Sequence, residues 1–149
     1  MASEQRMKLS TPANFTWSGN ALANGAGRQT TLIGNTTTKH VTSKIMADFV
    51  MGTTPTANTP VELYAIRGDG TIRSDGAGAS DAAWTQKNAK YIGSVMCTAT
   101  TTGAHYYGDF DWPYDCLGDE WGVGVMNKTG VALGSGSVIA YQSGLIEAQ

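Results

Sequence analysis

Apolar and polar side chains alternate along several short segments of this chain. One side of residues 44–51 collects Ile45, Ala47, Phe49 and Met51, and one side of residues 61–66 collects Val61, Leu63 and Ala65. A period of two is the pattern of a strand with one buried face. No segment repeats apolar residues at helical spacing over three turns, so the pattern predicts an all-β protein.

Six further segments are predicted strands: residues 14–18, 30–33, 91–99, 105–110, 120–127 and 137–141. In the segment 91–99, alternation places Tyr91, Val95, Cys97 and Ala99 on the buried side. Glu62 and Asp48 fall opposite the apolar stripes of their strands, as expected where one face meets a core. About eight short strands in one domain predict an antiparallel β-sandwich with a jelly-roll-like topology.

The first forty residues differ from the rest, because they are small, polar and rich in glycine. Between Ser18 and Thr31 the one sizeable apolar side chain is Leu22, which is little burial to offset the entropy of ordering that segment. We therefore expect residues 1–37 to form an N-terminal arm with the first strands, which contacts mainly other subunits, and residues 38–149 to form the sandwich domain.

Charge is sparse and unevenly divided. Only 15% of the residues are charged, and the formal net charge is −2. Residues 1–50 carry five basic and two acidic residues, giving +3, and residues 51–149 carry five and ten, giving −5. This balance lacks the clustered basic residues of a nucleic-acid-binding protein. The arm's Arg6, Lys8 and Arg28 are candidates for pairing with the acidic part of a neighbouring copy, with Phe15 and Trp17 as apolar anchors.

Two features bear on the compartment. No run of about 18 apolar residues exists, and residues 1–10 lack the apolar stretch of a signal peptide, so we expect a cytosolic protein without a membrane partner. Cys97 and Cys116 have no companions at zinc-ligand spacing. We expect both to be reduced, with Cys97 acting as a small core residue.

The sequence contains only weak patterns for catalytic or metal-binding residues. Carboxylates gather in residues 109–120. Two alternatives to a plain solvated turn are open for this segment. It could supply the catalytic acid of a glycoside hydrolase, from Asp109, Asp111 or Glu120, or it could bind calcium. His40 and His105 each stand alone in the sequence, without a nucleophile or a second ligand at useful spacing. The sequence therefore predicts no catalytic residue, no metal site and no cofactor.

Aromatic residues supply a different alternative. Trp84 and Trp112 are candidate platforms for stacking a sugar ring, which would make the protein a glycan- or receptor-binding module of a tail or surface appendage. In a β-sandwich, however, aromatic side chains more often close the core or an interface.

From residue 61 onward the order of features resembles a family of small bacteriophage virion structural proteins of jelly-roll type. The shared features are the strand at 61–64, the Gly-Asp-Gly loop at 68–70, the Tyr-Ile-Gly-Ser strand at 91–94 and the closing stretch at 121–133. Residues 116–120 depart from the Pro-rich approach to the closing strand in that family, which leaves the subfamily open.

The resemblance implies a non-enzymatic capsid decoration or cement protein, or a tail accessory protein. Its partners would be the major capsid protein or other virion proteins, and it would be assembled in the host cytoplasm. The neutral, hydroxyl-rich surface favours a closed homo-oligomer, for which we expect a trimer.

Overall fold

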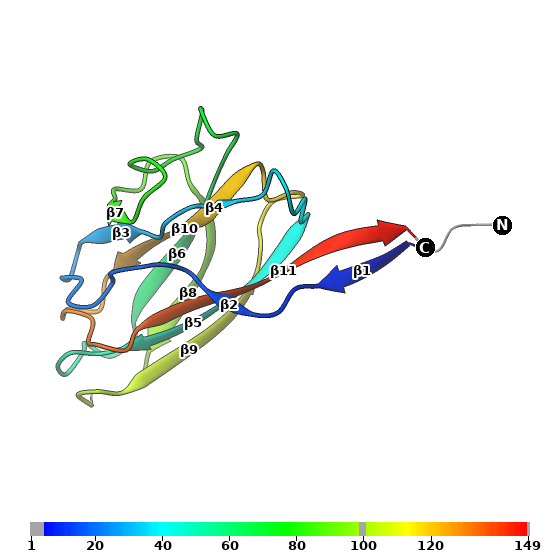
Figure 1. The fold of residues 1–149 in the computed structure, drawn as a ribbon. Coiled ribbons are helices and arrows are strands. Elements are labelled where there is room, and N and C mark those ends of the chain that lie inside the picture. The colour runs from blue at the N-terminus through cyan, green and yellow to red at the C-terminus, as the bar shows by residue number, and fades with distance from the viewer. Residues whose placement is uncertain (1–4, 99–100, 149) are drawn as a thin grey trace.

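Two antiparallel β-sheets pack face to face in the computed structural model of this chain, which describes residues 5–98 and 101–148 (Figure 1). The described residues contain no helix. The predicted all-β sandwich is therefore confirmed.

Neighbouring strands within each sheet are often distant in sequence. Sheet A has the order β1 (Gln5–Leu9), β11 (Val138–Ala148), β5 (Thr42–Val50) and β9 (His105–Asp111), and the short β2 (Ala13–Asn14) also pairs with β11. Sheet B has the order β7 (Ala82–Ala83), β3 (Gly27–Gln29), β10 (Glu120–Asn127), β6 (Thr59–Gly68) and β8 (Lys90–Cys97), and β4 (Ile33–Gly34) also pairs with β10. The described residues thus form eleven strands where about eight were predicted, and four of them have only two or three residues.

The core lies between the sheets, where the two clearest alternating patterns meet. Ile45, Phe49, Val61, Leu63 and their neighbours at every second position are buried, as predicted. Strand β10 has the predicted bounds, whereas β11 continues to Ala148, well beyond residue 141.

Tyr91 departs from its predicted face. It is half exposed, although Val95 and Cys97 on the same strand are buried as expected. The pairing of β8 with β6 shifts between Leu63 and Tyr64, where a β-bulge adds a residue to β8. One extra residue exchanges the two faces of a strand, so alternation is broken before residue 93. Ala99 lies outside the described residues.

Trp121 is the centre of an aromatic cluster within the core. Its ring makes edge-to-face contacts with Phe15, Trp112 and Tyr141 at centroid distances of 5.2, 5.2 and 5.1 Å. Such pairs stabilise a core beyond the effect of burial alone. Phe15, an expected anchor for other subunits, is thus part of its own domain's core.

The expectation that residues 1–37 contact mainly other subunits is therefore wrong for much of this segment. Strands β2, β3 and β4 pair with β10 and β11 of the same chain. Gln29 and Thr30 are fully buried, and the Thr30 hydroxyl accepts a hydrogen bond from the Val123 amide at 3.0 Å. The apolar count missed this segment because hydrogen-bonded polar side chains hold it in place.

The Gly-rich loop between β6 and β7 folds back over the edge of sheet B. The buried Gln29 amide donates to the carbonyl oxygens of Gly78 and Ser80, each at 2.7 Å, and accepts from the Ala77 amide at 2.6 Å. Asp75 accepts hydrogen bonds from the amides of residues 87, 88 and 89 at 2.7 to 3.0 Å. The loop is therefore held at two points.

We expect Asp75→Asn to lower the free energy of unfolding by about 1 kcal/mol at neutral pH, because hydrogen bonds to a charged acceptor are stronger than those to a neutral one. Burial raises the pKa of Asp75, but the backbone amides outweigh it and hold the pKa below its usual value. This stabilisation is present above about pH 4 and is lost as the pH falls through the lowered pKa.

Urea unfolding followed between neutral pH and about pH 2 measures both effects of this substitution. Asp75→Asn should flatten the acid side of the stability profile, whereas Asp115→Asn, at an exposed aspartate, should leave it unchanged. Equal acid profiles for wild type and Asp75→Asn would show that the carboxylate contributes nothing.

Strand β1 and the last part of β11 leave the sandwich together. They form a two-stranded antiparallel ribbon, in which Met7 pairs with Ile146 and Leu9 with Gly144 (Figure 1). We call residues 5–9 with 144–148 the ribbon. Neither the predicted arm nor the predicted strand 137–141 anticipated it.

Both cysteines are free. Cys97 is buried on β8, and burial raises the pKa of its thiol, while Cys116 is exposed. The core role expected for Cys97 is therefore confirmed.

Candidate interaction surface

The outer face of sheet A, turned away from the core, carries the most prominent exposed apolar side chains. Seven large apolar side chains are exposed among the described residues. Four of them lie on this one face: Met7, Leu9 and Ile146 on the ribbon and Tyr107 on β9. Because a shared patch of this kind is unusual on a soluble monomer, the face is the candidate interaction surface.

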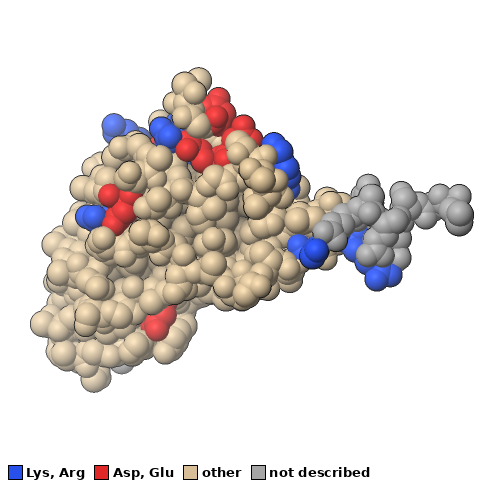
Figure 2. All heavy atoms as spheres, viewed as in Figure 1, with Lys and Arg blue, Asp and Glu red and all other residues tan. Residues whose placement is uncertain are grey.

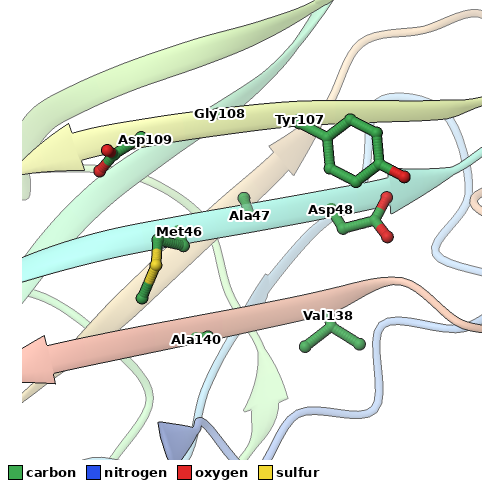
Figure 3. A pocket seen from close by; sticks show the side chains of 8 residues that line it. All are labelled: Met46, Ala47, Asp48, Tyr107, Gly108, Asp109, Val138 and Ala140. Atoms are coloured by element: carbon green, nitrogen blue, oxygen red, sulfur yellow. The ribbon is translucent and has the colours of Figure 1, made fainter. Parts of the chain in front are cut away.

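Strand register brings the side chains of this face into cross-strand rows. One row contains Val138, Asp48 and Tyr107, and the next contains Ala140, Met46 and Asp109. These rows line an open hollow of about 550 Å³, which we call the outer hollow (Figure 3). The apolar part of its floor consists of Met46 on β5 with Val138 and Ala140 on β11.

The side chain of Tyr107 stands at one end of the outer hollow and is 74% exposed. His105 stacks against the Tyr107 ring at a centroid distance of 6.1 Å, and its Nδ1 lies 3.0 Å from a carboxylate oxygen of Asp48. The tyrosine ring is therefore supported from one side while its other side faces solvent.

Carboxylates border the outer hollow along β9. Lys44 on β5 lies 3.8 Å from Asp109 and 3.5 Å from Asp111, and all three side chains are more than half exposed. Exposed pairs of this kind contribute little to stability. With Asp48, the outer face of β5 and β9 carries three acidic residues and one basic residue, a formal charge of −2.

The ribbon continues this face beyond the sandwich, where sheet B no longer lies behind it (Figure 1). Met7, Leu9 and Ile146 are 58%, 54% and 53% exposed and lie on the same side as the outer hollow. At the base of the ribbon, a second hollow of about 350 Å³ is lined by Met7, Leu9 and Lys44 among others. The two hollows and the ribbon therefore form one extended surface.

Charges elsewhere are concentrated in few places. Figure 2 shows basic residues on the ribbon and both signs over the loop near β7, while most of the remaining surface in that view is uncharged. Arg6 and Lys8, two predicted interface residues, are exposed on the ribbon's opposite side from Met7 and Leu9.

The remaining predicted interface residues lie within the sandwich. Arg28 forms an ion pair with Asp81 at 2.5 Å, and Asp81 also accepts from the Ser18 amide. Burial raises the pKa of Asp81, but these partners hold it below its usual value. Trp17 is partly buried, with its ring 5.9 Å from Phe49 in an edge-to-face contact. Arg28 and Trp17, which were predicted to contact other subunits, therefore make these contacts within their own domain.

Trp84 and Trp112, the predicted glycan platforms, are both buried. Trp84 packs on Tyr64 in a small cluster outside sheet B, and Trp112 donates its Nε1 hydrogen to the Cys116 carbonyl oxygen at 3.1 Å. Neither ring face is available for stacking a sugar, because a β-sandwich of this size uses its largest rings to fill space.

The candidate catalytic carboxylates are divided between the two sheets. Asp109 and Asp111 are on the outer face of β9, whereas Glu120 is on β10 in the other sheet, where it pairs with Arg73. Within residues 5–98 and 101–148, no three His, Cys, Asp or Glu side chains gather as metal ligands. The same residues include no helix long and apolar enough to cross a membrane.

His40, which stands alone in the sequence, has a partner in the structure. Its Nδ1 lies 2.5 Å from the hydroxyl oxygen of buried Ser143, and this oxygen lies 3.3 Å from the hydroxyl oxygen of Ser10. These three side chains meet where the ribbon leaves the sandwich, beside a hollow of about 150 Å³. We interpret the cluster as a tie that sets the direction of the ribbon.

The sequence did contain a signal for the ribbon. Residues 6–10 alternate basic, apolar, basic, apolar and polar, which is the period of a strand. Pairing with a partner strand more than 130 positions away carries no local signal, so the exposed face could be recognised only in the structure.

The fold and this surface define a two-sheet antiparallel β-sandwich with an exposed apolar face. Compared with known proteins, the chain matches no family model and no curated protein sequence.

Proposed function

We propose that this chain is a non-enzymatic virion structural protein, a decoration or cement protein that binds and stabilises the capsid lattice of a bacteriophage. The observation that carries the proposal is the outer face of sheet A, where a projecting ribbon exposes Met7, Leu9 and Ile146 beside the outer hollow. The resemblance of roughly residues 60–142 to small virion proteins is the reason for proposing a bacteriophage particle as the assembly.

The physical support comes from the balance between the sandwich and the ribbon. The sandwich has a complete core of its own, so it can fold before it meets a partner. The ribbon is a two-stranded element, which is only marginally stable in water without cover. A folded body that extends an uncovered apolar ribbon suits attachment to a preassembled protein surface.

The test is to recover particles from cells that carry the gene and to measure the chain within them by quantitative mass spectrometry. We expect a fixed ratio of the chain to the major capsid protein. Particles stripped of the chain should lose thermal stability and regain it when purified protein is added. Absence of the chain from purified particles would overturn the proposal.

A matched pair of variants connects attachment to the proposed surface. Leu9→Ser should reduce rebinding to stripped particles by about tenfold or more, because burying a leucine contributes about 1.5 kcal/mol or more. Met96→Ser, at an exposed apolar position on sheet B, should rebind like wild type. Equal rebinding by both variants would place the attachment surface elsewhere.

A further inference from the structure

We propose that the outer hollow binds an arginine side chain of a partner protein, with the guanidinium stacked on Tyr107 and paired with Asp48 and the methylene stem on the apolar floor. This inference deepens the proposed function and rests on it for its biological role, because it names a chemical group that the partner offers to sheet A. The isolated protein would show such binding whether or not the chain belongs to a particle.

An aromatic ring and a carboxylate stand side by side at one end of the outer hollow. Tyr107 on β9 is the cross-strand partner of Asp48 on β5, and both side chains lie on the outer face (Figure 3). The Tyr107 side chain is 74% exposed, so a partner can reach its ring. A cation placed over the face of a tyrosine ring is attracted to it, and in proteins this cation is more often arginine than lysine.

His105 holds both of these groups in place. Its ring stacks on Tyr107 at a centroid distance of 6.1 Å, and its Nδ1 lies 3.0 Å from each carboxylate oxygen of Asp48. Each oxygen of a carboxylate accepts about two hydrogen bonds, so Asp48 keeps acceptor positions for a partner. Groups that are ordered in advance lose less entropy on binding, which favours a defined site.

The rest of the outer hollow suits the stem of a long basic side chain. Met46, Val138 and Ala140 form an apolar floor within a hollow of about 550 Å³. Asp109 stands in the same cross-strand row as Met46, and its side chain is 63% exposed. Arginine lays its methylene stem along apolar surface and keeps its charged end in a polar setting. An apolar occupant would use the floor but leave the carboxylates without an opposite charge.

Formal charge on this face also favours a basic occupant. Asp48, Asp109 and Asp111 against Lys44 give the outer face of β5 and β9 a formal charge of −2. Lys44 lies near Asp109 and Asp111, whereas Asp48 contacts His105, which is charged only when it is protonated. A guanidinium at Asp48 would therefore bring an opposite charge to the end of the face that lacks a permanent cation. Complementary charges across a contact favour correct encounter and orientation.

Arginine fits this arrangement better than lysine. A guanidinium is planar, so it can stack on a ring and form two parallel hydrogen bonds to a carboxylate, whereas an ammonium is a compact, strongly hydrated charge. The chain makes a similar contact within itself, where the Arg67 guanidinium lies 4.0 Å from the centroid of the Tyr114 ring and the Lys90 ammonium lies 5.1 Å from it. We therefore expect arginine to bind about threefold or more tightly than lysine.

The methyl signals of isotope-labelled methionine in nuclear magnetic resonance spectra test the inference, with N-acetylarginine amide as the probe. We expect the Met46 signal to shift saturably, with a dissociation constant on the order of 1–10 mM for a single side chain. The signal of Met96, exposed on sheet B, should stay in place. N-acetylcitrulline amide has a similar shape without the charge and should bind about fivefold or more weakly. A shift that does not saturate, or equal binding of the two probes, would overturn the proposal.

Substitutions connect the binding to the named groups. Tyr107→Leu and Asp48→Asn should each weaken binding of the arginine probe by about threefold or more, whereas Tyr107→Phe keeps the ring and should bind like wild type. Asp111→Asn is the matched control, because it removes a carboxylate from the same strand outside the outer hollow. Wild-type binding by Tyr107→Leu, or an equal loss in Asp111→Asn, would contradict the proposed site.

Rebinding to stripped particles separates this inference from the proposed function. Tyr107→Leu should weaken rebinding by about threefold or more, in line with its loss of probe binding, and unchanged rebinding would show that the partner offers no arginine to this site. If the isolated protein binds the probe but particles lack the chain, the proposed function fails and the arginine site stands. If particles contain the chain but the probe does not bind, the arginine site fails alone.

Discussion

Replacement of Trp121 by alanine is expected to lower the free energy of unfolding by about 3–5 kcal/mol. Trp121 is 1% exposed and has three aromatic neighbours, one from the N-terminal segment and two from other strands or loops. Its removal leaves a large cavity that rigid rings cannot collapse to fill. Because domains are typically stable by about 5–15 kcal/mol, this one substitution should remove a large part of the total.

Urea unfolding, followed by circular dichroism, measures the loss. Tyr107→Ala is the matched control, since it removes an aromatic ring from an exposed position and should change stability by less than about 0.5 kcal/mol. A Trp121→Ala variant within about 1 kcal/mol of wild type would show that the cluster is not central to the core.

Gln29→Leu is expected to destabilise the protein by about 2 kcal/mol, the cost of leaving buried polar groups without partners. Leucine matches the volume of glutamine, so packing is largely retained. The substitution instead removes two hydrogen bonds to the carbonyl oxygens of Gly78 and Ser80 and one from the Ala77 amide. The loss should be concentrated in the loop that these groups hold against sheet B.

Hydrogen exchange of residues 75–81, measured beside urea unfolding, separates the local effect from the global one. In Gln29→Leu this loop should exchange much faster, while the amides of β5 and β6 follow the overall loss of stability. Gln86→Leu is the control, because the Gln86 amide makes only a long contact of 3.4 Å with the Ala89 carbonyl oxygen. Unchanged exchange in the loop of Gln29→Leu would contradict the proposed anchor.

Several features of the fold were predictable from local pattern. Alternation in residues 44–51 and 61–66 gave the buried faces of β5 and β6 directly, because a strand in a two-layer protein must turn every second side chain toward the core. Tyr91 shows the limit of this reasoning. The bulge opposite Leu63 exchanges the two faces of β8, and its position depends on pairing with β6.

The candidate site was less predictable than the fold. Composition indicated that the N-terminal segment would reach other subunits, and the structure divides that segment in two. Phe15 is buried in the domain's own core, whereas Met7 and Leu9 stand exposed on the ribbon. Both parts contain apolar residues among polar ones, and burial was decided by which distant strand each part pairs with.

By itself, then, the sequence determined the all-β class, the buried faces of its regular strands and the core position of Cys97, since all three follow from side-chain period and hydrophobicity. The tertiary structure alone decided that Trp84 and Trp112 are buried, that Gln29 anchors a loop and that β11 extends to pair with β1. These outcomes depend on contacts between residues far apart in the chain. Local pattern limits how a segment folds, but the segment's neighbours determine which of its side chains remain exposed to a partner.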